Sequence, residues 1–231
     1  MVRGRYDMIP GLHIAAKDLR EEMHTKQMLN SMIVFSLLVI VIFSIAFEDI
    51  ISSSNMVSML APGALWITFI FAGSLGLSRS FAAELDNGCL EGLKLCPVER
   101  SAIYLGKVIA SVILMFFVEL VTVPIFSVLF NYPFNGLFGL MIIIVLGTIG
   151  FVVVGTLLSA LTVNTRTREV LLPVLLLPLV VPVIIPSVLA TAQVLTGGGI
   201  ANVVQEIRLL VVYDVVFFIV AYLVFEHTLQ D

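Results

Sequence analysis

The feature of this sequence that most constrains its fold is a stretch from 120 to 165 that contains no charged residue. A helix of about 20 apolar residues crosses the hydrocarbon core of a bilayer, so this stretch is too long for a single crossing. Within it, the run Asn131-Tyr-Pro-Phe-Asn-Gly136 is a strong turn signal. The stretch therefore predicts two membrane-spanning helices joined by a short turn.

The composition of the whole chain has the same character. Charged residues make up 12% of the sequence and hydrophobic residues 60%, whereas a soluble domain carries roughly 25% charged residues. We therefore expect an all-α integral membrane protein with one transmembrane domain, over 29–225, built from six transmembrane helices. The expected spans are about 29–47, 60–78, 102–130, 137–162, 170–192 and 208–225.

Residues 1–28 precede the first span and are too charged for a signal peptide, so we expect the protein to retain them. Apolar side chains recur there at spacings of three and four residues. They are Ile9, Leu12, Ala16, Leu19 and Met23. This pattern predicts an N-terminal amphipathic helix that lies in the membrane interface. A soluble helix packed on a partner protein would show the same pattern.

Basic residues predict the orientation in the membrane. All of the 12 lysines and arginines except Arg208 precede the first span, or flank the connections between spans two and three and between spans four and five. Short cytoplasmic loops carry an excess of such residues. We therefore expect a multi-pass protein of the cell inner (cytoplasmic) membrane whose N- and C-termini and loop 79–101 are all cytoplasmic.

The fifth span carries four prolines, at positions 173, 178, 182 and 186. Each proline removes a backbone donor and opposes the preceding helical turn. Inside a bilayer the freed carbonyl groups need partners from protein or water. We therefore expect this span to pack against other spans or to line a cavity, and to be kinked or broken.

Motifs of catalysis are absent from the sequence. It has no G-x-x-x-x-G-K-[ST] nucleotide loop, no H-E-x-x-H motif and no G-x-S-x-G elbow. Cys89 and Cys96 are spaced C-x6-C without a nearby histidine, which fits neither a zinc site nor covalent haem attachment. We therefore expect no catalytic residue and no metal site, and active transport would need a separate nucleotide-binding subunit.

Two carboxylates fall inside the expected spans, Glu119 and Asp214. A charged group in the membrane is costly and usually faces the bundle interior, a cavity or a partner. Each is therefore a candidate for a substrate path or a coupling role, and a structural hydrogen-bonded group is the alternative. Arg208 is a candidate partner for Asp214, although a spacing of six residues does not place the two on one helix face.

Loop 79–101 has the most informative pattern. Phe81 and Leu85 share one face of a short helix, which Asn87-Gly88 would end. A second short amphipathic piece follows, from Cys89 to Leu95. A plain solvated connection would leave the leucines of this loop exposed. We therefore expect the loop to dock on a cytoplasmic partner.

Three segments of the chain resemble the CcmB family, the permease subunit of the haem-exporter ABC transporter of cytochrome c maturation. The first is Ala61-Pro-Gly63 followed by Trp66, and the second is F-x-x-E-x-x-x-G-x-L-E-x-L-x-L-x-P from Phe81 to Pro97. The third is the proline-rich LLPVLLLPLVVPVIIPSV of the fifth span. The resemblance extends over roughly 10–225, and the middle motif is its most specific part.

This resemblance implies an ABC-2-type exporter permease. It implies a homodimer driven by two copies of a CcmA-like ATPase, which would bind the ATP and Mg. A CcmC-like haem-handling membrane protein and a CcmD-like small subunit would be further partners. In loop 79–101, which would be the coupling element, the residues expected to meet the ATPase are Phe81, Glu84, Leu85, Asp86, Gly88, Leu90, Glu91 and Leu93.

Haem would be a cargo or handled ligand of the complex, and we expect this chain to bind no cofactor directly. The reason is that His13, His24 and His227 all fall on the expected cytoplasmic side. Two alternatives stay open. One is a generic ABC-2 permease for a lipid, a drug or a polysaccharide, and the other is a membrane scaffold for haem-handling proteins that transports nothing.

Overall fold

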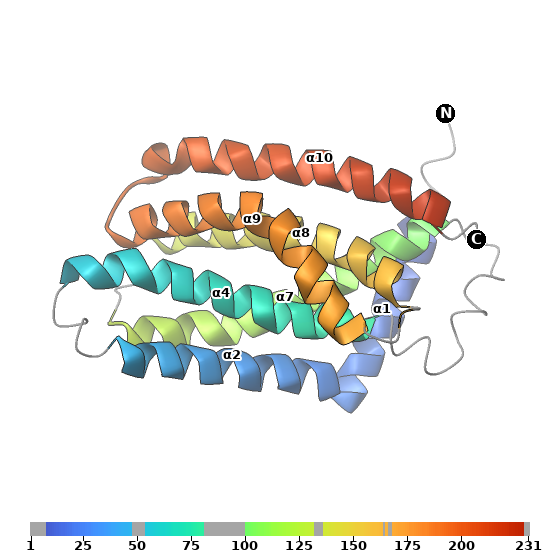
Figure 1. Cartoon of the computed structure of the whole chain (residues 1–231), viewed down its shortest axis with the longest axis horizontal. Coiled ribbons are helices and arrows are strands. Elements are labelled where there is room, and N and C mark those ends of the chain that lie inside the picture. The colour runs from blue at the N-terminus through green and yellow to red at the C-terminus, as the bar shows by residue number, and fades with distance from the viewer. Residues whose placement is uncertain are drawn as a thin grey trace.

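The computed structural model describes residues 8–47, 54–80, 100–131, 136–163, 165 and 168–228. Its long helices run roughly side by side, and one shorter helix, α1 (Met8–Thr25), lies across one end (Figure 1). The long helices are α2 (Gln27–Ala46), α4 (Ser54–Ser80), α7 (Arg100–Leu129), α8 (Leu137–Thr162), α9 (Arg168–Leu195) and α10 (Val204–Thr228). Within the described residues these six are long and apolar enough to cross a membrane, which confirms the all-α fold with six spans.

The two ends of the bundle differ in charge. We call the end at which α1 lies the basic end; Lys17 and Lys26 lie at it, as does Arg79 near the end of α4. The C-terminal end of α10 also lies toward this end (Figure 1). Arg208 lies near the start of α10, toward the opposite end.

The chain reverses at the opposite end through residues with positive φ. Gly136, with φ of 89°, precedes α8, and Asn131, with φ of 53°, follows α7. After α9, Gly197 has φ of 86°, and the amides of Gly197 and Gly198 donate to the carbonyls of Val194 and Gln193. This is a Schellman-type helix end, in which a glycine takes the left-handed position without a Cβ penalty.

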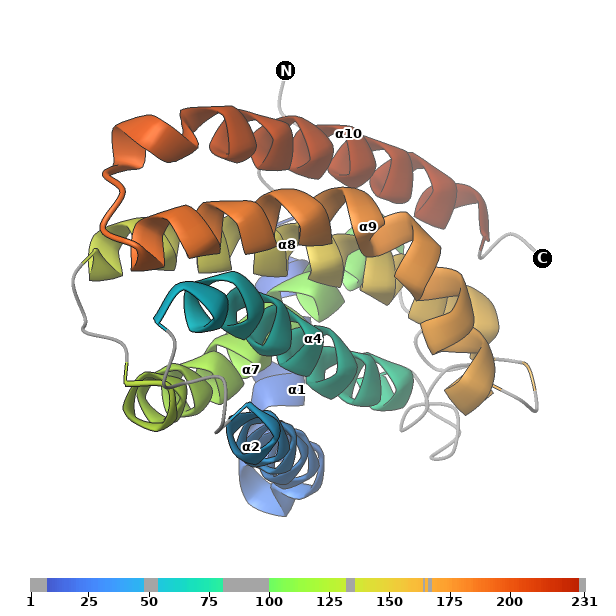
Figure 2. The ribbon, with the colours of Figure 1, turned by 60° about the vertical axis from the view of Figure 1, so that its left-hand side comes forward.

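Helix α8 is the centre of the bundle. It packs on α4, α7, α9 and α10, and most of its residues from 139 to 162 are buried. Figure 2 shows α4 and α9 on one side of it and α2 at the periphery. Glycines allow the closest approaches, since the backbones of membrane helices meet most tightly at small residues. A Cβ at Gly155 would lie 2.3 Å from Leu77 Cδ1, and a Cβ at Gly73 would lie 2.4 Å from Phe151 Cε1.

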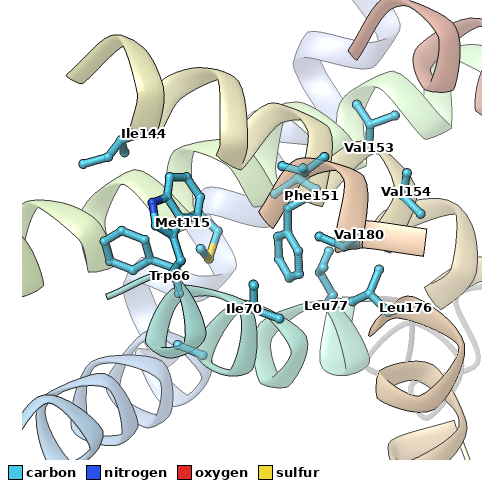
Figure 3. Close-up of a cluster of buried hydrophobic side chains, with 14 of the residues drawn as sticks. Trp66, Ile70, Leu77, Met115, Ile144, Phe151, Val153, Val154, Leu176 and Val180 are labelled. Atoms are coloured by element: carbon cyan, nitrogen blue, oxygen red, sulfur yellow. The ribbon is translucent and has the colours of Figure 1, made fainter. Parts of the chain in front are cut away.

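The core between these helices consists of large apolar side chains. Trp66, Met115 and Phe151 come from α4, α7 and α8 and point into one shared interior (Figure 3). Trp66 is 2% exposed, and its indole Nε1 donates a 3.0 Å hydrogen bond to Thr191 Oγ1 on α9. The side chain of Trp66 therefore joins three helices in the middle of the molecule.

The four prolines of the fifth span all lie inside α9, which continues from Arg168 to Leu195 and bends along its length (Figures 1 and 2). The span is therefore kinked and not broken. In its middle, the hydroxyl of Tyr213 on α10 donates a 2.8 Å hydrogen bond to the carbonyl oxygen of Leu179. A side chain from a neighbouring helix thus binds the backbone of α9 within the segment where prolines interrupt the hydrogen bonding.

Candidate functional site

The expected coupling loop lies outside the described residues. This applies to every residue that we expect at the ATPase interface, namely Phe81, Glu84, Leu85, Asp86, Gly88, Leu90, Glu91 and Leu93. The structure does describe both helix ends from which the loop emerges, Ser80 at the end of α4 and Arg100 at the start of α7. The candidate site therefore begins with what holds these two ends at the basic end of the bundle.

Lys107 is the residue that holds this junction together. It lies two turns into α7, and its side chain is only 3% exposed. Its Nζ lies 2.8 Å from Asp18 Oδ2 on α1 and donates a 3.1 Å hydrogen bond to the carbonyl oxygen of Ser80, the last residue of α4. One ammonium group thus connects α1, α4 and α7. We call the set of Lys107, Asp18 and Ser80 the lysine junction.

Beside the lysine junction, α1 and α7 are in close backbone contact. A Cβ at Gly106 would lie 2.7 Å from the carbonyl oxygen of Gly11, and a Cβ at Gly11 would lie 3.0 Å from the carbonyl oxygen of Ala102. Ala15, one turn beyond Gly11, is 3% exposed. Small residues are therefore what allows α1 to rest directly on α7.

The apolar stripe of α1 faces elsewhere. Leu12 and Met23 are 51% and 52% exposed, and Ala16 is exposed as well. The face buried against α7 carries Gly11, Ala15 and Asp18 instead. The sequence pattern identified the helix and its apolar stripe, and Asp18 points away from that stripe, toward α7. An apolar stripe that is exposed along a helix at the bundle end fits a helix that rests in a membrane interface.

The turn from α1 into the first span is capped by Glu22. Its Oε1 accepts a 2.7 Å hydrogen bond from the amide of Leu29, in the first turn of α2. Lys26, between the two helices, has φ of 51°, a left-handed conformation that redirects the chain. A carboxylate at a helix N-terminus also interacts favourably with the helix dipole. The angle between α1 and the first span is therefore held by specific bonds.

A cavity of about 350 Å³ opens between α1, α2, α4 and α7 next to the lysine junction. Its lining is mixed in charge, because Lys17, Asp18, Glu21, Glu22, Arg79 and Lys107 all contribute to it, together with polar and apolar side chains. The cavity separates α1 from the end of α4. Within the described residues, no three or more His, Cys, Asp or Glu side chains are grouped as metal ligands would be.

Glu119 lies in the middle of α7 and is 3% exposed. Its Oε1 accepts a hydrogen bond from the hydroxyl of Thr148 on α8, and its Oε2 has no hydrogen-bond partner among the described residues. The space beside Thr148 is a cavity of about 10 Å³, room for one water at most. The carboxyl group therefore lies in a packed position between α7 and α8, and the cavity on the Thr148 side is too small for a cargo.

Asp214 on α10 is 9% exposed, and neither of its carboxylate oxygens accepts a hydrogen bond from the described residues. It packs against α8 so closely that a Cβ at Gly150 would lie 2.4 Å from its Oδ1. Arg208 is exposed and is not the hydrogen-bonded partner that we considered for it. Within the described residues, Asp214 is thus a buried acid without the hydrogen bonds that such groups usually have.

Both membrane carboxylates contact α8, but they do not form one site. Glu119 meets Thr148, and Asp214 meets Gly150, two positions further along. Successive helix residues are rotated by about 100°, so positions two apart lie on nearly opposite faces. The two acids are therefore on opposite sides of the central helix.

Comparison with known proteins identifies the family. The family model described as "CcmB protein" matches residues 11–231, nearly the whole chain. The chain belongs to the CcmB family. Two similar relatives are each named "Heme exporter protein B". The protein from Rhodobacter capsulatus is 32% identical over 53% of this chain and 56% of its own length, and the one from Haemophilus influenzae is 31% identical over 71% of this chain and 73% of its own length.

A third relative of that name, from Pseudomonas aeruginosa, is 27% identical over 63% of this chain and 64% of its own length. The chain thus matches between about half and three quarters of the length of these CcmB-family relatives. The family resemblance that the sequence motifs indicated is confirmed.

Sequence reasoning missed the lysine junction of this CcmB-family chain. It counted Lys107 as one more basic residue on the cytoplasmic side, and it proposed no partner for Asp18 or for Lys107. One signal was present: a lysine that follows Gly106 inside an apolar run requires a partner when it is buried. Which acid would serve as that partner could not be read from the sequence, because Asp18 and Lys107 lie on helices far apart in the chain.

Proposed function

We propose that this chain is the membrane permease subunit of an ATP-driven exporter that serves cytochrome c biogenesis. It couples ATP hydrolysis by a separate CcmA-like ATPase to haem export or to release of a haem-loaded chaperone. The observation that carries the proposal is the CcmB match over residues 11–231 on a chain with six membrane-spanning helices. The names of the relatives favour haem over a lipid, drug or polysaccharide cargo.

The proposal includes the assembly and its orientation. Two copies of the permease work with two ATPase subunits and with CcmC-like and CcmD-like partners. The basic end faces the cytoplasm, where the ATPase binds, because short cytoplasmic loops carry the excess of Lys and Arg. The absence of a nucleotide-binding loop from the sequence supports placing hydrolysis on the partner. Loop 81–97 then passes the closure of the ATPase dimer into the bundle.

Gentle purification of the tagged protein from its native membrane, followed by mass spectrometry and an ATPase assay, tests this proposal. We expect an ATPase and a haem-handling membrane protein to co-purify, with hydrolysis that the haem-loaded chaperone stimulates. An ATPase without a haem-handling protein would support the generic exporter. Haem-handling proteins without an ATPase would support the scaffold and contradict the coupling role.

Two substitutions in the loop test the coupling interface. Leu90→Asp places a charge at an apolar position of the expected docking surface, which is costly to bury, and Glu91→Arg reverses a charge on that surface, which turns an attraction into a repulsion. We expect either change to abolish the stimulated ATPase activity while the protein still reaches the membrane. Gln205→Arg, at an exposed position of the opposite end, is the matched control and should leave the stimulation intact.

A further inference from the structure

The lysine junction lies at the base of the expected coupling loop. Ser80 is the last residue of α4, and the residues expected to meet the ATPase begin at the next position, Phe81. The carbonyl oxygen of Ser80 accepts a hydrogen bond from Lys107, and the same ammonium is paired with Asp18 in the second half of α1. A displacement of the loop at its α4 end therefore acts directly on a group that also holds α1.

The packing around the junction is tight on one side and open on the other. Gly11 and Gly106 bring the backbones of α1 and α7 together with no room for a Cβ, so these two helices must move together. The cavity of about 350 Å³ separates α1 from the end of α4. Relative movement is thus easiest between α1 and α4, across the boundary that Lys107 bridges.

The burial of the pair decides how firmly it holds. An exposed ion pair contributes little and breaks readily, whereas the side chains of Lys107 and Asp18 are 3% and 13% exposed. Asp18 also lies 3.6 Å from Lys17 Nζ, so separating the pair removes one of its two partners, whereas it takes the carboxylate away from the buried Lys107 ammonium, which is strongly unfavourable. The junction therefore behaves as a link that resists separation.

From this geometry, and on the basis of the function proposed above, we infer that Lys107 is a positioning residue for energy coupling. It makes α1 and α7 follow the end of α4 when the ATPase moves loop 81–97. Helix α1 then moves during the transport cycle, and its exposed apolar stripe lets it slide along the membrane surface. Neither Lys107 nor Asp18 contacts cargo in this role.

The test uses the full complex with Lys107→Met, which keeps much of the side-chain volume but removes the charge. The measured quantity is the ratio of haem-loaded chaperone released to ATP hydrolysed. We expect this ratio to fall about tenfold, within the usual range for coupling between two sites. Arg20→Met, at an exposed basic residue of α1, is the control and should keep the native ratio.

A purely structural role would lower ATP hydrolysis and release together and leave their ratio unchanged, and that result would overturn the inference. If Lys107→Met fails to assemble, Asp18→Asn tests the same bond from the other helix while keeping the shape of the side chain. If the unaltered complex contains no ATPase, the proposed function fails first. If it couples normally and both variants couple equally well, the inference alone fails.

Distance measurements give a readout that is independent of activity. Spin labels at the exposed positions Arg20 on α1 and Arg79 on α4 would report the separation across the cavity, in a background with Cys89 and Cys96 replaced by serine. We expect a narrow distance distribution with Lys107 present, with and without trapped nucleotide, and a broad one in Lys107→Met. Equal widths in the two proteins would contradict the link.

Discussion

The substitution Gly147→Ala tests whether close packing at the centre of the bundle determines its stability. A Cβ at Gly147 on α8 would lie 2.1 Å from Cη2 and 2.6 Å from Cζ3 of Trp66, and 2.9 Å from Ser187 Oγ. The Trp66 indole cannot swing aside freely, because it is buried and hydrogen-bonded to Thr191. The added methyl group must therefore displace either the indole or a whole helix.

The expected cost follows from three contributions. Overpacking of a well-packed core costs about 1–3 kcal/mol, and losing the Trp66–Thr191 hydrogen bond adds about 1 kcal/mol. Replacing a helical glycine by alanine stabilises the helix by about 0.5–1 kcal/mol. We therefore expect Gly147→Ala to lower the free energy of unfolding by about 1–3.5 kcal/mol. Unfolding of the purified chain in mixed detergent, followed by far-UV circular dichroism, measures this change.

Gly63→Ala is the matched control, because Gly63 also lies inside a membrane helix but has nothing within 4 Å of its Cβ position. It should be neutral or stabilising by up to about 1 kcal/mol. A double-mutant cycle with Trp66→Phe sharpens the test, since phenylalanine lacks the two ring atoms that clash. The pair should cost about 1 kcal/mol less than the sum of the single changes. Additive effects, or a Gly147→Ala protein as stable as the native one, would refute this reasoning.

Three further predictions concern the membrane acids and the orientation. Glu119→Gln should change the free energy of unfolding by no more than about 0.5 kcal/mol and should keep transport, because an amide oxygen can still accept the hydrogen bond from Thr148. Loss of transport in a stable protein would instead place Glu119 on the substrate path. Asp214→Val should raise the free energy of unfolding by about 1 kcal/mol in the same assay, since it removes two buried oxygens that accept no hydrogen bond from the described residues. A loss of stability would reveal a bond to the carboxylate. Cys89 should react with a membrane-impermeant maleimide only after permeabilisation, whereas Thr196→Cys in a cysteine-free background should react in intact cells; the reverse pattern would invert the proposed orientation.

The spans were predictable from the sequence because their cause is local. Each long helix is an apolar run, and inside a bilayer such a run must satisfy its backbone hydrogen bonds within the helix. The reversal before α8 was likewise marked by turn residues that end at Gly136. The sixth span was harder to delimit: the helix begins at Val204 and includes charged Glu206 and Arg208, whereas hydropathy alone favoured a start near 208.

The arrangement of the helices was not predictable in the same way. It depends on where small residues allow two helices to approach closely. In the sequence, a glycine at a helix contact, such as Gly106 or Gly147, cannot be told from a glycine at an open position. Gly63 is open, whereas Gly147 is covered by Trp66. The pairing of Lys107 with Asp18 follows from the crossing of α1 over α7, so it could not be derived before that crossing was known.

The placement of Glu119 and Asp214 on nearly opposite faces of α8 limits what they can do together. A cargo path that used both acids would have to pass on both sides of the central helix, which packs on four neighbours. A single path on one side of α8 can therefore be lined by only one of the two acids, and the hydrogen bonding of the two differs. Glu119 joins α7 to α8 through Thr148, whereas Asp214 has no bond from the described residues that would repay its burial. A buried acid that lowers stability without making a stabilising bond is typical of a functional residue. Asp214→Val should therefore have opposite effects on stability and on transport: the protein should become more stable and lose transport.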